Sequence, residues 1–308
     1  MKTMSLGGKL SVPEIGLGCM RINILDKVRT ESYIRTAIEL GVNFFDHADI
    51  YGGGECEAHF SQSLGMTPAL RETMILQTKC AIRPGICYDF SREHILSSVE
   101  GSLRRLRTDY IDILLLHRPD ALMEPQEVAE AFAALRQAGK VRYFGVSNHN
   151  SYQIALLSRY LGEDAIIANQ MQLSITDCPM IDHGLNVNTG TPHAVDRDNG
   201  TLDYCRLHGI SIQAWAPLRY RFSGGKGVFI GSEKFPELNE KLGEIAGRYG
   251  VTPPAVAVAW ILRHPAKIQA IMGTTNADRL GEVCRASGLT LSREEWYELY
   301  LAGGKTLP

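Results

Sequence analysis

Short apolar runs alternate with amphipathic helical stretches along almost the whole chain. Eight runs rich in β-branched and aromatic residues predict strands at 15–19, 43–46, 74–79, 111–117, 141–146, 166–170, 211–215 and 268–272. Helical spacing predicts helices at 29–40, 55–64, 91–106, 127–138, 151–160, 202–208, 238–249, 254–263 and 277–286. A capping box formed by Ser292 and Glu295 opens a last helix. This order is typical of βαβ units around a parallel sheet.

Eight strands in this order, with no long polar linker, predict a (β/α)₈ barrel (TIM barrel) that forms a single domain over residues 1–308. We expect a hairpin before the first strand and extra helices near the C-terminus. The segment 174–200 is different, because it is long, rich in Gly, Asn, Asp, Pro and Thr, and carries no predicted element. It follows the sixth strand, so we expect an unstructured binding loop or lid on the catalytic face.

Composition narrows the function classes. The chain is 44% hydrophobic and 21% charged, with a formal net charge of −2, which argues against nucleic acid or an anionic membrane as partner. Its seven cysteines include no C-x-x-C pair, so we expect reduced thiols. The first residues lack the apolar segment of a secretory signal, and no apolar run reaches about 18 residues. We therefore expect a cytoplasmic protein.

Four polar residues stand at or just after the ends of three consecutive predicted strands. Asp46 and Tyr51 follow the second strand, Lys79 ends the third and His117 ends the fourth. Each alone has an ordinary structural explanation, such as a loop cap or a hydrogen-bonded core histidine. Active sites of this fold are built at the carboxyl ends of neighbouring strands, so their coincidence there predicts a catalytic group.

These four residues suit the reduction of a carbonyl. A tyrosine with a pKa near 10 keeps its proton at neutral pH and can give it to a developing alkoxide. The ammonium of Lys79 is expected to lower the pKa of Tyr51, and Asp46 to keep that ammonium charged. His117 can donate a hydrogen bond to the carbonyl oxygen.

At these residues the chain resembles an aldo-keto reductase over nearly its whole length. Asp46, Tyr51, Lys79 and His117 match the family's catalytic tetrad, and GKVRYFGVSN matches its fifth strand. HADIYGG and HRPD are most similar to a bacterial branch of monomeric, largely uncharacterised oxidoreductases. The resemblance implies a monomer that reduces small-molecule carbonyls with NADPH.

The resemblance also implies a set of cofactor contacts. Residues expected near the nicotinamide and the pyrophosphate are Cys19, Met20, Ser147, Asn148, Gln170, Trp215, Pro217 and Leu218. Residues expected at the adenosine 2′-phosphate and the adenine are Gly273, Thr274, Thr275, Arg279 and Glu282. The chain departs from many relatives in having Gly273 in place of Lys and Val283 in place of Asn. The lost lysine leaves the preference for NADPH over NADH open.

Three alternatives remain open. A metal-dependent hydrolase could use residues near the strand ends, namely Asp46, His47, Asp49 and His117. Strand alternation, however, points Asp46 and His47 to opposite faces, and His183 and His193 in the long loop are expected to be solvated. A Schiff-base aldolase could use Lys79. A cofactor-binding regulatory subunit of a channel would keep the same tetrad.

The sequence does not identify the carbonyl substrate. The pocket is expected to be lined by residues around the tetrad and by the segment 174–200. Arg118, beside His117, could attract an acidic substrate or form a surface pair with Asp120.

Overall fold

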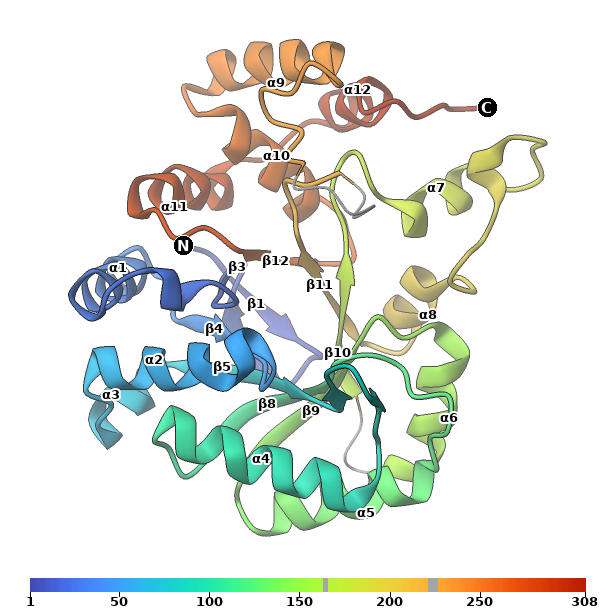
Figure 1. The fold of residues 1–308 in the computed structure, drawn as a ribbon. Helices are drawn as coiled ribbons and strands as arrows, with labels where there is room; N and C mark the ends of the chain where they lie inside the picture. The colour runs from blue at the N-terminus through green and yellow to red at the C-terminus, as the bar shows by residue number, and fades with distance from the viewer. Residues whose placement is uncertain (163–165, 221–226) are drawn as a thin grey trace.

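The computed structural model describes residues 1–162, 166–220 and 227–308. Eight parallel strands, each paired with the next along the chain and the last with the first, close a barrel (Figure 1). These strands are β3 (Ile15–Gly18), β4 (Phe44–Asp46), β5 (Ile75–Cys80), β8 (Ile111–Leu116), β9 (Val141–Ser147), β10 (Ile166–Gln172), β11 (Ser211–Trp215) and β12 (Gln269–Met272). The predicted strands and the predicted barrel are confirmed.

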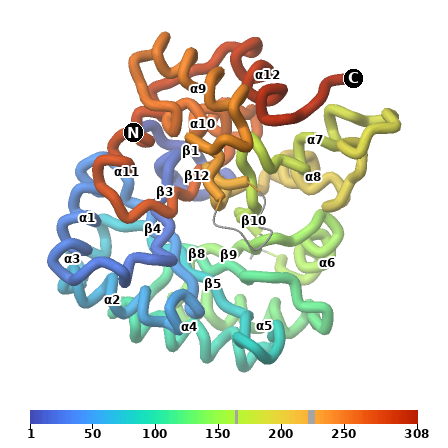
Figure 2. Tube along the Cα trace, turned by 45° about the horizontal axis from the view of Figure 1, so that its top comes forward, coloured from blue at the N-terminus to red at the C-terminus, as the bar shows by residue number. Residues whose placement is uncertain are grey.

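Helices surround the strands in both views (Figures 1 and 2). Those that follow the barrel strands are α1 (Lys27–Glu39), α2 (Glu55–Leu64), α4 (Arg92–Leu106), α5 (Pro125–Gln137), α6 (Ser151–Leu161), α8 (Thr201–Leu207), α10 (Pro253–Leu262) and α11 (Ala277–Cys284). Two more, α9 (Pro236–Tyr249) and α12 (Arg293–Ala302), lie outside α10. The capping box predicted at Ser292 and Glu295 begins α12.

Helix α10 is apolar all round because it is covered on both sides. Its residues from Ala255 to Ile261 are buried, and Trp260 stacks on Trp296 of α12 with ring centroids 4.7 Å apart. Each indole N–H of this pair donates to the backbone carbonyl of the other residue at 3.0 Å, so neither buried polar group is left unpaired. Among the described residues, no helix is long and apolar enough to cross a lipid bilayer.

The expected N-terminal hairpin is formed by β1 (Thr3–Leu6) and β2 (Leu10–Pro13). It covers the amino ends of the barrel strands. Leu6 and Val12 pack in one cluster with the apolar side chains of β4, β8 and β10, and the backbone N–H of Gly7 donates to Ser211 Oγ, at the start of β11, at 2.9 Å. The opposite, carboxyl ends of the strands therefore carry the candidate site.

The expectation of an unstructured segment at 174–200 was wrong. This segment contains α7 (Pro179–Leu185) and the 3₁₀ turn η3 (Pro192–Ala194), and Met180 and Ile181 of α7 are buried. The element is short, and its few apolar residues lie among turn-forming ones, so no helical period stands out in the sequence. A proline at the first helical position marks the start of each of the two elements.

Other short elements were also missed. They are helix α3 (Pro68–Glu72), the hairpin of β6 (Ile82–Arg83) with β7 (Cys87–Tyr88), and the 3₁₀ turns η1 (Ile22–Ile24), η2 (Tyr51–Gly54) and η4 (Arg285–Gly288). All seven cysteines, each in the described part of the chain, are free thiols.

Candidate active site

Three side chains of the candidate tetrad are brought together by neighbouring strands. Asp46 ends β4, Lys79 lies near the end of β5, and His117 directly follows β8. These strands are adjacent in the barrel, with Asp46 paired with Gln77 and Lys79 paired with Leu115. The predicted meeting of these residues at one rim is therefore present in the structure.

Tyr51 reaches the same rim through a tight turn. It begins η2, and the next three residues, Gly52, Gly53 and Gly54, have φ values of 59°, 67° and 95°. Residues with a Cβ rarely adopt this left-handed region, so the glycines allow the chain to turn from the rim into α2 at once. At Gly54 a Cβ would also lie 3.0 Å from the side chain of Arg105. The glycine run thus fixes where Tyr51 stands.

Lys79 is the centre of the site. Its Nζ lies 2.8 Å from each carboxylate oxygen of Asp46, 2.9 Å from the carbonyl oxygen of His47 and 3.1 Å from Tyr51 Oη. The side chain of Lys79 is fully buried and that of Asp46 is 4% exposed. A buried ammonium is costly unless it is paired, and here every donor direction has an acceptor.

The surroundings set the protonation states. Burial alone lowers the pKa of Lys79, but the charge of Asp46 and the contact with Tyr51 raise it above its usual range, so Lys79 is an ammonium at neutral pH. For Tyr51 burial is the larger effect and raises the pKa, although Lys79 acts to lower it. The expectation that Lys79 would bring the pKa of Tyr51 down was therefore wrong in its net sign.

His117 faces Tyr51 across the site, with ring centroids 5.9 Å apart and planes at 81°. Burial, followed by the charges of Lys79 and Arg118, lowers the pKa of His117 to about 2. The ring is thus neutral at physiological pH and keeps one N–H to donate. Its buried Nδ1 has no hydrogen-bond partner among the described residues.

A ladder of glutamines inside the barrel was not predicted. Gln77 Nε2 donates to Asp46 Oδ1 at 2.6 Å and to Gln213 Oε1 at 3.0 Å, and Gln170 Nε2 reaches the same two oxygens at 3.1 and 3.3 Å. Gln213 Nε2 continues to Gln269 Oε1 at 2.8 Å, and Gln269 Nε2 ends on the carbonyl of Pro13. All four glutamines are buried. The sequence did contain a signal for this ladder, because each of four apolar strands carries one glutamine. The interior of such a barrel is normally filled by aliphatic side chains.

The residues expected at the nicotinamide form a second connected group. Trp215 Nε1 donates to Asn148 Oδ1 at 3.2 Å, Asn148 Nδ2 donates to Ser147 Oγ at 2.8 Å, and Ser147 Oγ donates to the carbonyl of Gln170 at 2.8 Å. Asn148 has a φ of 60°, in the left-handed region that asparagine adopts more readily than most residues. The half-buried indole of Trp215 is therefore held in one orientation.

Four further residues expected near the cofactor lie around this group. Cys19 is buried, and its backbone N–H donates to the carbonyl of Asp46 at 2.8 Å, whereas the side chain of Met20 is 53% exposed at the rim. Pro217 is buried and Leu218 is half-buried after β11. Burial raises the pKa of the Cys19 thiol well above its usual range, so Cys19 is an apolar wall and not a nucleophile.

The segment expected at the 2′-phosphate is more open. Gly273, Arg279 and Glu282 are exposed, and Thr274 and Thr275 are half-buried before α11. The side chain of Asn276 accepts from the backbone N–H of Arg279 and caps the helix. Two residues outside the prediction hold this segment, because Tyr33 Oη donates to the carbonyl of Thr274 at 2.7 Å and Arg21 Nη2 to that of Gly273 at 3.0 Å.

Arg21 stands close to the position where the sequence lacks the lysine of many relatives. Its guanidinium comes from the segment after β3 and reaches the backbone of Gly273 itself. Sequence reasoning missed it because the two positions are far apart in the chain.

Two open questions from the sequence receive answers from the geometry. His47 faces α2, with its ring 4.7 Å from that of Phe60, while Asp46 turns to Lys79, so His47 and Asp46 cannot share a metal ion.

The carboxylate of Asp120 accepts from the backbone N–H groups of Phe90 and Leu122. Among the described residues, Arg118 has no hydrogen bond or ion pair with it.

Comparisons with known proteins agree with this geometry. The model of the aldo/keto reductase family matches residues 14–300. The chain is 38% identical to the uncharacterized oxidoreductase YcsN of Bacillus subtilis, over 98% of both chains, and 35% identical to a 6-dehydroglucose reductase of Agrobacterium fabrum, over 99% of both. The crystal structure of an aldo-keto reductase from Klebsiella pneumoniae in complex with NADPH has a TM-score of 0.78 and 25% identity, over 99% of this chain and 96% of that one.

Proposed function

The chain belongs to the aldo/keto reductase family of oxidoreductases, and from this premise we propose that it reduces aldehydes or ketones with NADPH, with Tyr51 as the proton donor. The observation that carries the proposal is the contact of Lys79 Nζ with both oxygens of Asp46 at 2.8 Å and with Tyr51 Oη at 3.1 Å. A tyrosine hydroxyl held beside a buried, permanently charged ammonium is arranged to release its proton when negative charge develops next to it.

The proton path runs through these three residues. The carbonyl oxygen of the substrate would lie against Tyr51 Oη and take its proton as the alkoxide forms. The phenolate left on Tyr51 is stabilised by the ammonium of Lys79, whose own charge is balanced by Asp46. Regeneration requires only that Tyr51 take up a proton from water after the product alcohol leaves.

His117 would orient the carbonyl. The ring is neutral because its pKa is lowered to about 2, by burial first and then by the nearby cations, so it donates a hydrogen bond without carrying a charge. It stands on the side of the site opposite Tyr51. Two donors that converge on one oxygen fix the angle of the carbonyl and stabilise its developing charge.

The charge state of Lys79 argues against the Schiff-base alternative. A nucleophilic lysine needs a free lone pair, whereas the pKa of Lys79 is raised by Asp46 and Tyr51 against the effect of burial. All of its hydrogen atoms are engaged by acceptor oxygens. Lys79 is suited to electrostatic support and not to covalent bond formation.

The residues of this chain fit a nicotinamide cofactor. When bound, NADPH supplies the hydride that reduces the carbonyl carbon. Trp215, fixed by its bond to Asn148, offers a half-buried aromatic face to the ring, and the amide of Asn148 offers polar atoms to its carboxamide. At the other end, Thr274 and Thr275 precede the capped start of α11, where backbone N–H groups favour a phosphate.

Two exposed cations would complete the phosphate site. Arg279 lies in the first turn of α11, and Arg21 lies against the backbone of Gly273. We propose that Arg21 takes over part of the charge of the lysine that many relatives have in place of Gly273. The preference for NADPH over NADH would then rest on these two arginines.

The test is oxidation of NADPH by the purified protein with a panel of aldehydes, diketones, quinones and sugar aldehydes. The reaction is monitored by the loss of NADPH absorbance. Sugar aldehydes belong in the panel because the Agrobacterium relative is a 6-dehydroglucose reductase. We expect turnover with some of these carbonyls and none with the matching alcohols. Tight NADPH binding with negligible turnover on every carbonyl would contradict the proposal and favour a regulatory subunit.

A further inference from the structure

We propose that His183, Asp196 and Asp198 bind a divalent transition-metal cation of the Zn²⁺ class. One potential ligand atom from each residue lies within 4.8 Å of one from each of the other two. This is the only group of three or more His, Cys, Asp and Glu residues with such spacing in the described part of the chain. It lies in the segment 174–200, away from the tetrad, and the proposed reduction does not use it.

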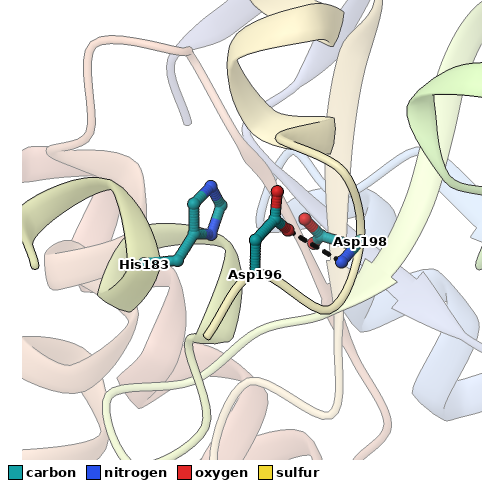
Figure 3. A group of neighbouring side chains, drawn as sticks. All are labelled: His183, Asp196 and Asp198. Atoms are coloured by element: carbon teal, nitrogen blue, oxygen red, sulfur yellow. Dashed lines mark hydrogen bonds between the residues drawn. The ribbon is translucent and has the colours of Figure 1, made fainter. Parts of the chain in front are cut away.

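The three residues come from two separate pieces of that segment. His183 belongs to α7. Asp196 and Asp198 lie in residues 195–200, here called the strap, which connect η3 to α8 (Figure 3). Contrary to the sequence expectation, His183 is half-buried and not free in solvent. A shared cation would therefore join α7 to the strap.

The histidine is prepared as a ligand. Its Nδ1 lies 3.0 Å from the carbonyl oxygen of Pro179, one helical turn earlier, and a carbonyl can only accept. Nδ1 therefore carries the hydrogen, which leaves the lone pair on Nε2. Metal-bound histidines usually donate their other ring N–H to a backbone carbonyl or carboxylate in this way, since it fixes the tautomer and the orientation of the ring.

Both carboxylates are anchored by backbone N–H groups. Asp196 accepts from the backbone N–H of Asp198 at 3.0 Å, which is the only hydrogen bond within the group (Figure 3). Asp198 uses one oxygen to accept from the backbone N–H of Thr201. Within residues 1–162, 166–220 and 227–308, neither carboxylate forms an ion pair with a lysine or arginine.

The donor set favours zinc-like ions over calcium or magnesium. One imidazole nitrogen with carboxylate oxygens suits Zn²⁺ and its first-row neighbours, whereas Ca²⁺ and Mg²⁺ prefer oxygen alone. In a tetrahedral site with bonds of about 2.0–2.2 Å, ligand atoms are roughly 3.4 Å apart. Closing from the observed spacing would require side-chain rotations, for which the exposed Asp196 has room. Water would supply the fourth ligand.

Such a cation would order the segment that crosses the catalytic face after β10. It would link the part containing α7, which is also tied to the C-terminal tail by the 2.8 Å ion pair of Asp182 with Lys305, to the start of α8. The consequence is that metal changes the stability and protease resistance of this segment. It does not change the tetrad.

The experiment is a Zn²⁺ titration measured by isothermal titration calorimetry. The Cys87→Ser protein is the reference, so that the exposed thiol of Cys87 does not compete for zinc. We expect one ion per chain. His183→Ala and Asp196→Asn should weaken this binding by at least about tenfold. His193→Ala is the matched control, since His193 is a half-buried histidine of the same segment that lies outside the group.

A second measurement makes the result independent of folding defects. Zn²⁺ should slow proteolytic cleavage within 174–200 in the reference protein and in His193→Ala, but not in His183→Ala or Asp196→Asn. Binding of NADPH by every variant, measured from its fluorescence, reports that the barrel is intact. Equal zinc affinity in all four proteins, or no stoichiometric binding by the reference protein, would overturn the proposal.

Discussion

The two ends of the candidate active site are built in opposite ways. At the tetrad, Asp46 and Lys79 are almost fully buried, and the carboxylate of Asp46 accepts from side chains of the neighbouring strand β5. At the proposed 2′-phosphate end, Arg21 and Arg279 are exposed, and the segment is held through its backbone. The side chains of the first end are held together before any ligand binds, whereas the second end offers exposed cationic side chains to a phosphate.

This difference follows from what each end has to do. Proton transfer needs atoms fixed to within fractions of an ångström, and a low-dielectric site makes each charge count for more. Phosphate recognition tolerates looser placement, because long cationic side chains can adjust to a doubly charged group. Substitutions should therefore have large, position-specific effects at the tetrad and small, salt-dependent effects at the phosphate end.

The largest effect is expected for Tyr51→Phe. Loss of the general acid should lower kcat by about 10²–10⁴-fold, while NADPH binding stays unchanged because only a hydroxyl is lost. Steady-state kinetics and cofactor titration measure the two quantities separately. Tyr204→Phe removes the hydroxyl of a partly buried tyrosine of α8 and should change neither. An equal loss of NADPH affinity in Tyr51→Phe would mean that Tyr51 serves binding and not chemistry.

Asp46→Asn should have the next largest effect, on stability as well as activity. It leaves the fully buried ammonium of Lys79 without its counter-charge, which should lower the free energy of unfolding by about 3–5 kcal/mol. Urea denaturation measures this. The control is Asp26→Asn, which alters an exposed ion pair with Arg29 at the start of α1 and should cost less than about 1 kcal/mol. Similar losses for both variants would show that Lys79 is not a buried, paired charge.

Gln77→Leu tests whether the glutamine ladder supports the tetrad. It removes the donor 2.6 Å from Asp46 Oδ1, and we expect a loss of about 1–3 kcal/mol in stability with a severalfold fall in kcat. Gln269→Leu breaks the ladder at its far end, against Gln213 and Pro13, so it should cost similar stability and leave kcat unchanged. If both variants lowered kcat equally, the ladder would act on the barrel as a whole and not on Asp46.

The smallest effect is expected at the phosphate end. Arg279→Ala should weaken NADPH binding by up to about tenfold at low salt, and NADH binding much less, with the difference shrinking as salt rises. Arg285→Ala is the control, because Arg285 follows α11 and donates to the carbonyl of Gly250. Equal weakening of both cofactors by Arg279→Ala would place Arg279 at the adenine and not at the 2′-phosphate.

The sequence predicted the parts of the molecule that repeat a simple period. All eight barrel strands, and the convergence of Asp46, Lys79 and His117, follow from alternating apolar runs and from the rule that strand ends meet at one rim. Helix α7 was missed because a single short turn of helix with buried Met180 and Ile181 carries no repeat. Pro179 at its first position was a signal, although prolines are equally common in turns.

Features that depend on long-range contacts could not be predicted. Arg21 meets Gly273 only because β3 and β12 are neighbours in the closed barrel. The pKa of Tyr51 is a balance between burial and Lys79, and composition does not give the depth of burial that decides it. The glutamine ladder needs the register of β5, β10, β11 and β12, since only that register brings the side chains into one row.

The most direct test of the central claim is the pH dependence of both reaction directions. Because burial outweighs Lys79 and raises the pKa of Tyr51 above its usual value of 10.0, the tyrosine stays protonated at neutral pH. Reduction needs this protonated form, so its kcat should be flat from about pH 6 to pH 9. Oxidation of the alcohol needs the phenolate, whose fraction rises tenfold per pH unit below the pKa. The logarithm of the oxidation rate should therefore rise with pH with a slope of about one.

The titrations of His117 and Asp49 can be distinguished from that of Tyr51 in this measurement. His117 is already neutral throughout, because its pKa is about 2, and Asp49→Asn removes a carboxyl whose pKa burial, and next Glu57, raise to about 7. We expect the slope to persist in Asp49→Asn and to disappear in Tyr51→Phe. A reduction rate that falls between about pH 6 and pH 8, or a slope that survives in Tyr51→Phe, would show that another group supplies the proton.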